Sequence, residues 1–182
     1  MLALFRLLSH LPLALLHAVG SALGWLAWLG SPTYRRRFRA NAAQAGLAGA
    51  ATRAAIGQAG RMVTELPRLW LGRPVPIEWE GAQWIDAAHA RGKGIVFLTP
   101  HLGCFEITAQ GYARRYAEAR RPLTVLYRPA RKAWLRPLLD SARGRPGLAT
   151  APTTLAGVKQ LLKALKSGQA VGLLPDQVPP QG

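Results

Sequence analysis

The chain has 182 residues and carries 24 Lys and Arg against 8 Asp and Glu, a formal net charge of +16. A chain of this length buries one main core, and such a charge indicates acidic partners: phospholipid headgroups, a phosphorylated glycolipid, an acidic carrier protein or nucleic acid. The single cysteine, Cys104, excludes an internal disulfide and a cysteine-based zinc site.

The N-terminal segment is nearly free of charge. Arg6 is the only charged side chain in the first 31 residues, and residues 7–31 are rich in Leu, Ala and Trp. As one helix this run would extend about 37 Å, enough to cross a bilayer core, although Pro12 and several glycines would loosen it. Arginines at 35–39 follow at once, which favours a cytoplasmic position for the rest of the chain. We expect residues 1–31 to form a membrane anchor.

Two alternatives exist for this segment. A cleaved signal peptide would have one charge in its n-region, and an arginine cluster so close behind it would oppose export. A helix lying in the membrane interface would instead place His10 and His17 on a polar stripe. The sequence favours an anchor and leaves open whether it spans the membrane or lies in the interface.

Residues 32–76 form a basic, helical connecting region, in which helix-forming residues predominate up to Trp70 and prolines mark the end. Beyond it the pattern becomes α/β. We predict an α/β fold with a largely parallel sheet and flanking helices, because helices and strands alternate at the spacing of βαβ units. The predicted helices cover 86–90, 106–118 and about 155–167, and the predicted strands cover 95–98, 123–127 and 170–174.

The last predicted helix has clear ends and two kinds of side chain. Thr153 or Thr154 is the expected N-cap and Gly168 the expected stop. Its apolar residues are predicted to form one stripe that packs on the sheet, opposite three lysines that are predicted to be solvated. The apolar residues are Leu155, Val158, Leu161, Leu162 and Leu165, and the lysines are Lys159, Lys163 and Lys166.

A histidine and a carboxylate stand where the first predicted strand turns into a helix. His101 falls in the loop after the strand, and Glu106 falls in the first helical turn. A histidine held by a glutamate is a general base for a hydroxyl nucleophile. The alternative is structural, with His101 capping the loop and Glu106 favouring the positive end of the helix dipole.

Three candidate residues lie at or just past the carboxyl ends of predicted strands, namely His101, Arg128 and Asp176. A parallel sheet brings such residues to one edge, where ligands bind. Arg128 can hold a phosphate group bidentately, or it is a plain surface arginine. Asp176 can bind a sugar hydroxyl or orient an arginine, or it is a turn residue after Pro175. Cys104 is an alternative nucleophile, but a small apolar packing role suits it better.

From Ile77 to Gln177 the chain resembles the lipid A biosynthesis acyltransferases, the lauroyl/myristoyl transferase branch of the lysophospholipid acyltransferase superfamily. Cys104 stands where that family often has Asn, and the family extends further at its C-terminus. We therefore expect residues 77–182 to be an incomplete acyltransferase domain that exposes apolar surface and has little activity. The matching pieces, in order, are Glu80-Gly81, Arg91-Gly92-Lys93-Gly94, His101-Leu102-Gly103-Cys104-Phe105-Glu106, Tyr127-Arg128-Pro129 and Leu174-Pro175-Asp176-Gln177.

The resemblance implies a glycerolipid acyltransferase-like fold and a reaction. A fatty acyl chain would move from an acyl carrier protein to a hydroxyl of a lipid A precursor, with no metal or other cofactor. His101 would be the base, Glu106 its orienting partner, and Arg128 and Asp176 would bind substrate. The protein would sit at the inner membrane of a bacterium, with the catalytic part facing the cytoplasm and the anionic membrane surface as a partner.

Two other functions remain open. One is an acyltransferase of the same superfamily that acts on another glycolipid or on a lysophospholipid. The other is a non-enzymatic, membrane-tethered basic module that binds anionic lipid or nucleic acid. Nucleic acid is disfavoured, because the sequence has no helix-turn-helix, zinc or RNA-binding signature and its aromatic residues sit on apolar faces.

Overall fold

The computed structural model describes residues 2–116, 121–127, 138–139, 144 and 146–176. It consists of two compact units. One unit is helical and runs from Ala3 to Arg73; the other runs from Pro74 to Gly182 and includes the first two residues. The first unit contains the predicted anchor, and the second contains the candidate site residues.

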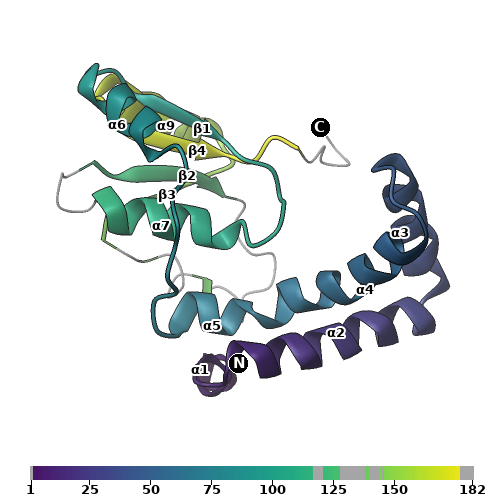
Figure 1. Ribbon diagram of the computed structural model, residues 1–182. Coiled ribbons are helices and arrows are strands. Elements are labelled where there is room, and N and C mark those ends of the chain that lie inside the picture. The colour runs from purple at the N-terminus through teal and green to yellow at the C-terminus, as the bar shows by residue number, and fades with distance from the viewer. Residues whose placement is uncertain (1, 117–120, 128–137, 140–143, 145, 177–182) are drawn as a thin grey trace. The chain divides into compact units, whose positions relative to one another are not determined.

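The helical unit contains α1 (Leu2–Ser9), α2 (Leu13–Gly30), α3 (Pro32–Gln44), α4 (Gly49–Thr64) and α5 (Leu66–Leu71) (Figure 1). The apolar N-terminal run is two helices, with Pro12 at the N-cap of the second. Proline lacks a backbone N–H donor, so it suits the start of a helix and not its interior. Ser31 ends α2 and caps α3, where its hydroxyl accepts the Tyr34 N–H at 3.2 Å.

Among the described residues, α2 is the one helix that is long and apolar enough to cross a membrane by length and composition. It packs mainly against α4 within the helical unit. Only three residues of α2 are buried there, namely Leu16, Gly20 and Gly24. The predicted anchor therefore contains a helix of suitable length, but that helix has a protein partner along one side.

The second unit contains α6 (Ala82–Ala90), β1 (Ile95–Leu98), α7 (Glu106–Tyr116), β2 (Leu123–Tyr127), β3 (Leu148–Pro152), α9 (Leu155–Lys166) and β4 (Ala170–Leu173). The four strands pair in the order β1-β4-β2-β3, and every pairing is parallel. The predicted α/β fold with a parallel sheet and flanking helices is confirmed. Parallel pairing places all four carboxyl ends at one edge of the sheet.

The prediction missed β3. Its sequence is Leu-Ala-Thr-Ala-Pro, in which Thr150 is the one β-branched residue and two alanines and a proline stand where strands usually have branched or aromatic residues. The strand exists because it pairs with β2 over its full length, from Leu123 against Leu148 to Tyr127 against Pro152. It is the last strand in the sheet order, a position where proline is tolerated.

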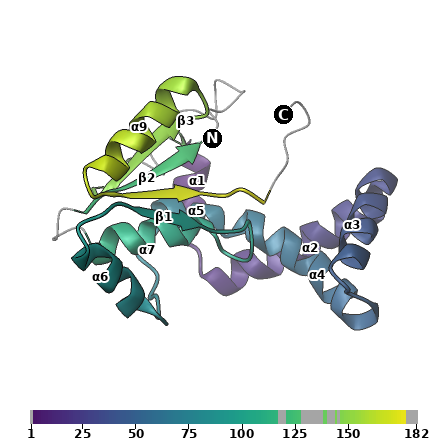
Figure 2. The same ribbon diagram turned by 90° about the horizontal axis from the view of Figure 1, so that it is seen from above.

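Helices cover both faces of the sheet (Figure 2). On one face, α6 and α7 pack over a buried cluster of Tyr112, Tyr116, Leu123 and Ala170. On the other face, α9 packs over a cluster of Ala151, Leu161, Ala164 and Val171. These two layers of apolar contact fix the sheet and thus the positions of the loops at its carboxyl edge.

α9 begins and ends as predicted, but its apolar stripe does not all face the sheet. Thr154 is the N-cap and its hydroxyl accepts the Gly157 N–H at 3.3 Å, while Gly168 has φ +73° just after the helix. The buried face consists of Gly157, Leu161 and Ala164. Leu165 packs against the same buried cluster, but at 100° per residue positions 155, 158 and 162 lie about 100° or more around the helix from Gly157. The exposed apolar residues are Leu155, Val158 and Leu162, and the three lysines are exposed as predicted.

Polar contacts also join α6 to α7 beneath the sheet. The Tyr112 hydroxyl contacts His89 Nε2 at 2.9 Å, and the Tyr116 hydroxyl donates to Asp86 Oδ1 at 2.8 Å. Burial raises the pKa of the Tyr112 phenol, so this group stays neutral. These contacts hold α7, the helix that begins with Glu106.

Candidate active site

The candidate site forms where β1 and β4 end side by side. The Thr99 N–H donates to the Leu173 carbonyl at 3.1 Å, so the chain leaves β1 while still paired with β4. His101 lies in the loop between β1 and α7, and Asp176 lies in the turn after β4. Residues 75 positions apart in the chain are thereby brought to the same edge of the sheet.

Asp176 contacts His101 at two points. Its Oδ2 accepts the backbone N–H of His101 at 2.8 Å, and its Oδ1 contacts the ring Nδ1 at 2.8 Å. The side chain of His101 is 28% exposed and that of Asp176 is 37% exposed, so solvent and a substrate can reach the pair. The two contacts together fix the ring relative to the backbone of its own loop.

The hydrogen bonds from His101 lower the pKa of the Asp176 carboxyl, with the side-chain bond as the largest cause and the backbone bond next. The carboxyl is therefore ionised near neutral pH, and an ionised carboxylate only accepts hydrogen bonds. Nδ1 of a neutral His101 must then carry the proton and donate it to Oδ1. Nε2 is left with its lone pair, which is the form of imidazole that takes up a proton.

The loop after His101 places an aromatic ring and a second carboxylate nearby in sequence. The rings of His101 and Phe105 meet edge to face, with centroids 4.7 Å apart. Gly103 has φ +55°, a left-handed conformation that glycine adopts without steric cost. Glu106 is the first residue of α7, where the positive end of the helix dipole favours an anion.

The four predicted site residues thus have different outcomes. His101 and Asp176 come together at the edge of the sheet, as expected from their positions just after two predicted strands. Arg128 lies outside the described residues; β2, which pairs with β4, ends one residue before it at Tyr127. Glu106 remains the predicted orienting partner of His101, and the structure adds a contact of 2.8 Å between His101 Nδ1 and Asp176 Oδ1. Only the adjacency of β1 and β4 reveals that contact, so sequence spacing alone could not find it.

An apolar surface lies on β1, the first strand in the sheet order. Val96 and Leu98 are 50% and 67% exposed, while their neighbours Ile95 and Phe97 pack into the core beneath the sheet. Alternation along the strand places Val96 and Leu98 on the same face. Leu102, next to His101, is also exposed. An apolar ligand group therefore has exposed aliphatic side chains close in sequence to His101.

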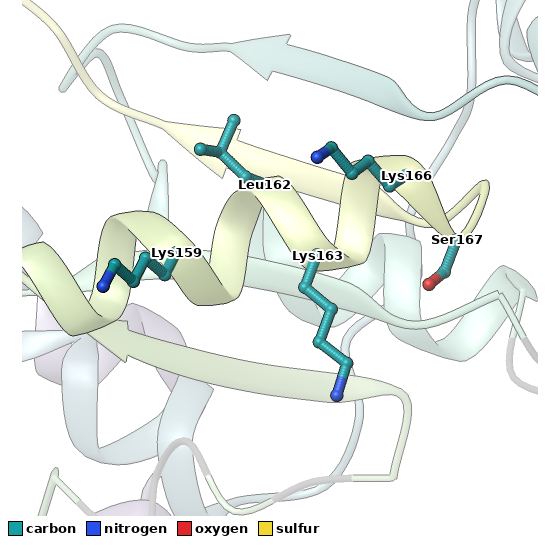
Figure 3. Close-up of a pocket in the computed structure, with 5 residues that line it drawn as sticks. All are labelled: Lys159, Leu162, Lys163, Lys166 and Ser167. Atoms are coloured by element: carbon teal, nitrogen blue, oxygen red, sulfur yellow. The ribbon is translucent and has the colours of Figure 1, made fainter.

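A shallow groove runs along the outer side of α9, away from the His101 loop in sequence (Figure 3). Three lysine side chains and an exposed leucine line it together with the serine that ends the helix. This surface is therefore both basic and apolar. Such a combination suits the docking of an acidic partner protein, because the lysines attract its negative charge. The lining residues are Lys159, Leu162, Lys163, Lys166 and Ser167.

Across the part of the chain that the structure describes, no group of three or more His, Cys, Asp or Glu side chains could hold a metal ion. Cys104 lies in the same loop as His101 and is half-buried, which suits a packing role.

Comparison with known proteins gives one family. The family model described as bacterial lipid A biosynthesis acyltransferase matches residues 1–181. No individually curated protein matches this sequence. The family match covers both structural units, including the loop with His101, the end of β4 with Asp176 and the N-terminal apolar helices. This chain belongs to the bacterial lipid A biosynthesis acyltransferase family.

Proposed function

We propose that this acyltransferase moves a fatty acyl chain from an acyl carrier protein thioester to a hydroxyl of a lipid A precursor, with His101 as the general base. The family match supports acyl transfer in lipid A biosynthesis. The observation that carries the mechanism is the two-point contact between Asp176 and His101 at the carboxyl edge of the sheet.

The proton path follows from that contact. With Nδ1–H bound to Asp176, Nε2 of His101 accepts the proton of the acceptor hydroxyl as its oxygen attacks the thioester carbonyl. A carbon–oxygen bond forms, the carbon–sulfur bond breaks, and the proton passes from the imidazolium to the departing thiolate. Asp176 stabilises the imidazolium between these steps by charge and by hydrogen bonding.

Two further residues complete the proposal. Glu106, at the start of α7, supplies a second negative charge that stabilises the imidazolium. Arg128, just past the end of β2, binds a phosphate group of the acceptor bidentately. Asp176, besides its contact with His101, has a partly exposed carboxylate that can also accept a hydrogen bond from a sugar hydroxyl. No separate serine or cysteine nucleophile is required.

The donor is proposed to use the two other surfaces of this unit. The acyl chain lies along the exposed aliphatic side chains of β1, where burial of apolar surface favours binding. The acidic carrier protein docks on the lysine face of α9. At the inner membrane, the arginines that follow α2 favour a cytoplasmic position for this unit, next to the anionic headgroups.

The test is transfer by membrane fractions that contain the wild-type chain or His101→Ala, with an acyl carrier protein thioester and a lipid A precursor as substrates. Loss of the base should reduce kcat by about 10²–10⁴ without a change in the amount of membrane-bound protein. His10→Ala is the matched control, because His10 is an exposed histidine in the helical unit. Activity of His101→Ala equal to wild type would refute the mechanism.

The same assay separates the alternative functions. Transfer to a lysophospholipid but not to the lipid A precursor would identify another acceptor with the same chemistry. Binding of anionic vesicles by the wild-type chain, with no transfer to either acceptor, would favour the non-enzymatic module.

A further inference from the structure

The helical unit holds α2 and α4 together by close contact between glycines. An alanine Cβ at Gly60 of α4 would overlap the carbonyl oxygen of Gly20 on α2, and one at Gly24 would overlap the Ile56 carbonyl. An alanine Cβ at Gly57 would lie 3.6 Å from the Ser21 Cβ. Backbones can approach this closely only where side chains are absent. The two helices therefore form one packed hairpin.

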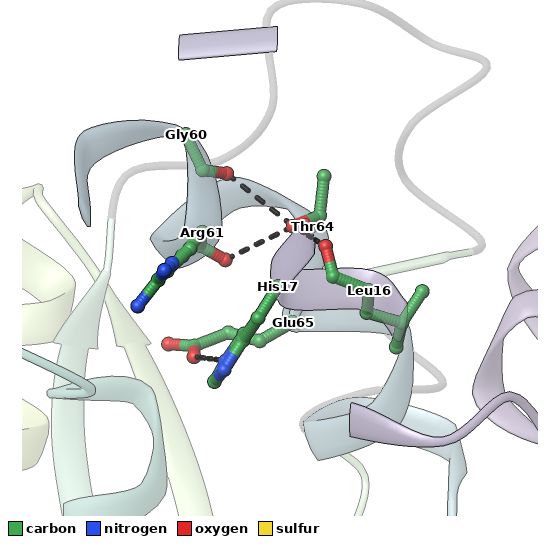
Figure 4. Close-up of polar contacts among 6 residues, drawn as sticks. All are labelled: Leu16, His17, Gly60, Arg61, Thr64 and Glu65. Carbon is green, nitrogen blue, oxygen red and sulfur yellow. Dashed lines mark hydrogen bonds and ion pairs between the residues drawn. The ribbon is translucent and has the colours of Figure 1, made fainter. Parts of the chain in front are cut away.

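Polar contacts fix the register of this hairpin (Figure 4). The Thr64 hydroxyl donates to the Leu16 carbonyl at 2.7 Å. His17 Nε2 lies 2.9 Å from Glu65 Oε2. Both contacts join the first half of α2 to the end of α4, so the helices run antiparallel and are tied at this end. Separation of the helices would break both contacts and leave Glu65 without its histidine partner.

The side of α2 that does not contact α4 is a continuous apolar stripe. Its exposed positions recur at intervals of four and three residues, which places them on one face of the helix. Each of these side chains is 47–63% exposed, and none is charged or polar. The stripe consists of Leu15, Val19, Leu23, Leu26 and Leu29.

The composition of α4 prevents the hairpin from crossing a bilayer as a unit. α4 carries Arg53, Gln58 and Arg61 along its length. A charged arginine in the hydrocarbon centre of a bilayer is costly, and two in one helix would be more so. α2 alone would extend about 27 Å, close to the thickness of about 30 Å of a bilayer core, and would have to leave α4 to span it.

Basic and aromatic residues at the end of α2 indicate the partner. The guanidinium groups of Arg35 and Arg39 both lie 5.3 Å from the centre of the Trp28 ring. Tryptophan beside arginine suits the headgroup layer, where the ring contacts acyl chains and the cation contacts lipid phosphate. Four arginines of α3 thus stand directly beyond an apolar stripe, which is a charge pattern that complements an anionic leaflet.

We infer that α2 does not cross the membrane but lies in its plane as one half of the α2–α4 hairpin, with the leucine stripe inserted into the acyl layer of one anionic leaflet. Both ends of α2 then lie on the same side of the membrane. This inference concerns the attachment of the chain and does not depend on the proposed transfer reaction.

A cross-linking experiment tests whether the hairpin persists in membranes. In a Cys104→Ala background, Ser21→Cys and Gly57→Cys place two Cβ atoms 3.6 Å apart, within the range of a disulfide. A protease site inserted at Gly46 reports the cross-link, because the two fragments then stay together until they are reduced. Ser21→Cys with Gln58→Cys is the control pair, since Gln58 is exposed.

We expect the first pair to cross-link on oxidation in native membranes and the control pair not to do so. A first pair that cross-links in detergent but not in membranes would overturn the inference, because α2 would then have left α4 in the bilayer. Cross-links between two copies through Leu23→Cys would overturn it as well, because the stripe would be covered by another copy and not by lipid.

A second measurement does not depend on the glycine positions. In the same Cys104→Ala background, single cysteines replace His10 and Thr33, which are exposed residues beyond the two ends of α2. A membrane-impermeant maleimide should label both in inverted inner-membrane vesicles and neither in intact spheroplasts. Labelling of the two positions from opposite sides would show that α2 spans the membrane.

Discussion

Asp176 holds His101 through both of its carboxylate oxygens, one on the backbone N–H and one on the ring Nδ1, each at 2.8 Å. The contact joins the loop after β1 to the turn after β4 and depends on the parallel pairing of these two strands. It sets which ring nitrogen remains available to a substrate. The pairing of β1 with β4 therefore determines which ring nitrogen of His101 carries the proton.

The first prediction compares Asp176→Asn with Glu106→Gln. An asparagine has one acceptor oxygen for two donors, so one of the two contacts with His101 must be lost. We expect kcat to fall about 10²–10⁴-fold in Asp176→Asn and to fall severely in Glu106→Gln, where the negative charge near the imidazolium is lost.

Nitrogen NMR of the His101 ring separates the two roles. The Nδ1 signal should change in Asp176→Asn and stay unchanged in Glu106→Gln. The reverse pattern would mean that Glu106, and not Asp176, orients the ring in solution.

The second prediction concerns pH. The pKa of Asp176 is lower in the folded chain than its ordinary value, because His101 donates to the ionised form. The stabilisation from this contact is therefore complete above the ordinary range of an aspartate and is lost as the pH falls through the lowered pKa. His101→Ala should raise the pKa of Asp176 towards its ordinary value, as measured by carbon NMR of the carboxyl group. An unchanged pKa would show that the side-chain contact is not populated in solution.

The third prediction concerns Cys104. If His101 activates the acceptor hydroxyl directly, Cys104→Ala and Cys104→Ser should keep kcat within a few-fold of wild type. The measurement is steady-state transfer, together with mass spectrometry of the intact protein after it is mixed with the donor. An inactive Cys104→Ala, or a trapped acyl group on the cysteine, would favour a thiol nucleophile.

The fourth prediction concerns the basic face of α9. Lys159→Glu with Lys163→Glu should raise KM for the acyl carrier protein thioester at least tenfold and leave KM for a short acyl thioester without the carrier unchanged. Arg114→Glu is the control, because Arg114 lies on α7, which covers the opposite face of the sheet. An equal rise in both KM values, or the same rise in the control, would argue against carrier docking on α9.

The fifth prediction concerns the hairpin glycines. Gly60→Ala should lower the free energy of unfolding in detergent by about 1–3 kcal/mol, because its Cβ meets the α2 backbone. Gly30→Ala should be neutral or stabilising by up to about 1 kcal/mol, because no atom lies within 4 Å of its Cβ position. Equal thermal unfolding of the two variants would show that α2 and α4 are not closely packed.

Local patterns in the sequence determined much of the second unit. β1 and β2 have the predicted bounds, and α9 begins after Thr154 and ends before Gly168. These elements are determined by periodicity, capping and glycine conformation, which act over a few residues. The same local signals placed His101 and Asp176 after strands, and so predicted that both would lie at one edge of the sheet.

Other features were decided only by the tertiary structure, because they depend on contacts between segments that are far apart in the sequence. β3 has weak strand character and exists through its pairing with β2. Three of the five residues of the predicted apolar stripe on α9 are exposed, because the sheet contacts only one side of that helix. The contact of Asp176 with His101 Nδ1, and the packing of α2 on α4 through glycines, join residues 75 and about 40 positions apart. Residue spacing carries no information on such pairs, because strand order and helix pairing are set by the packing of the whole unit.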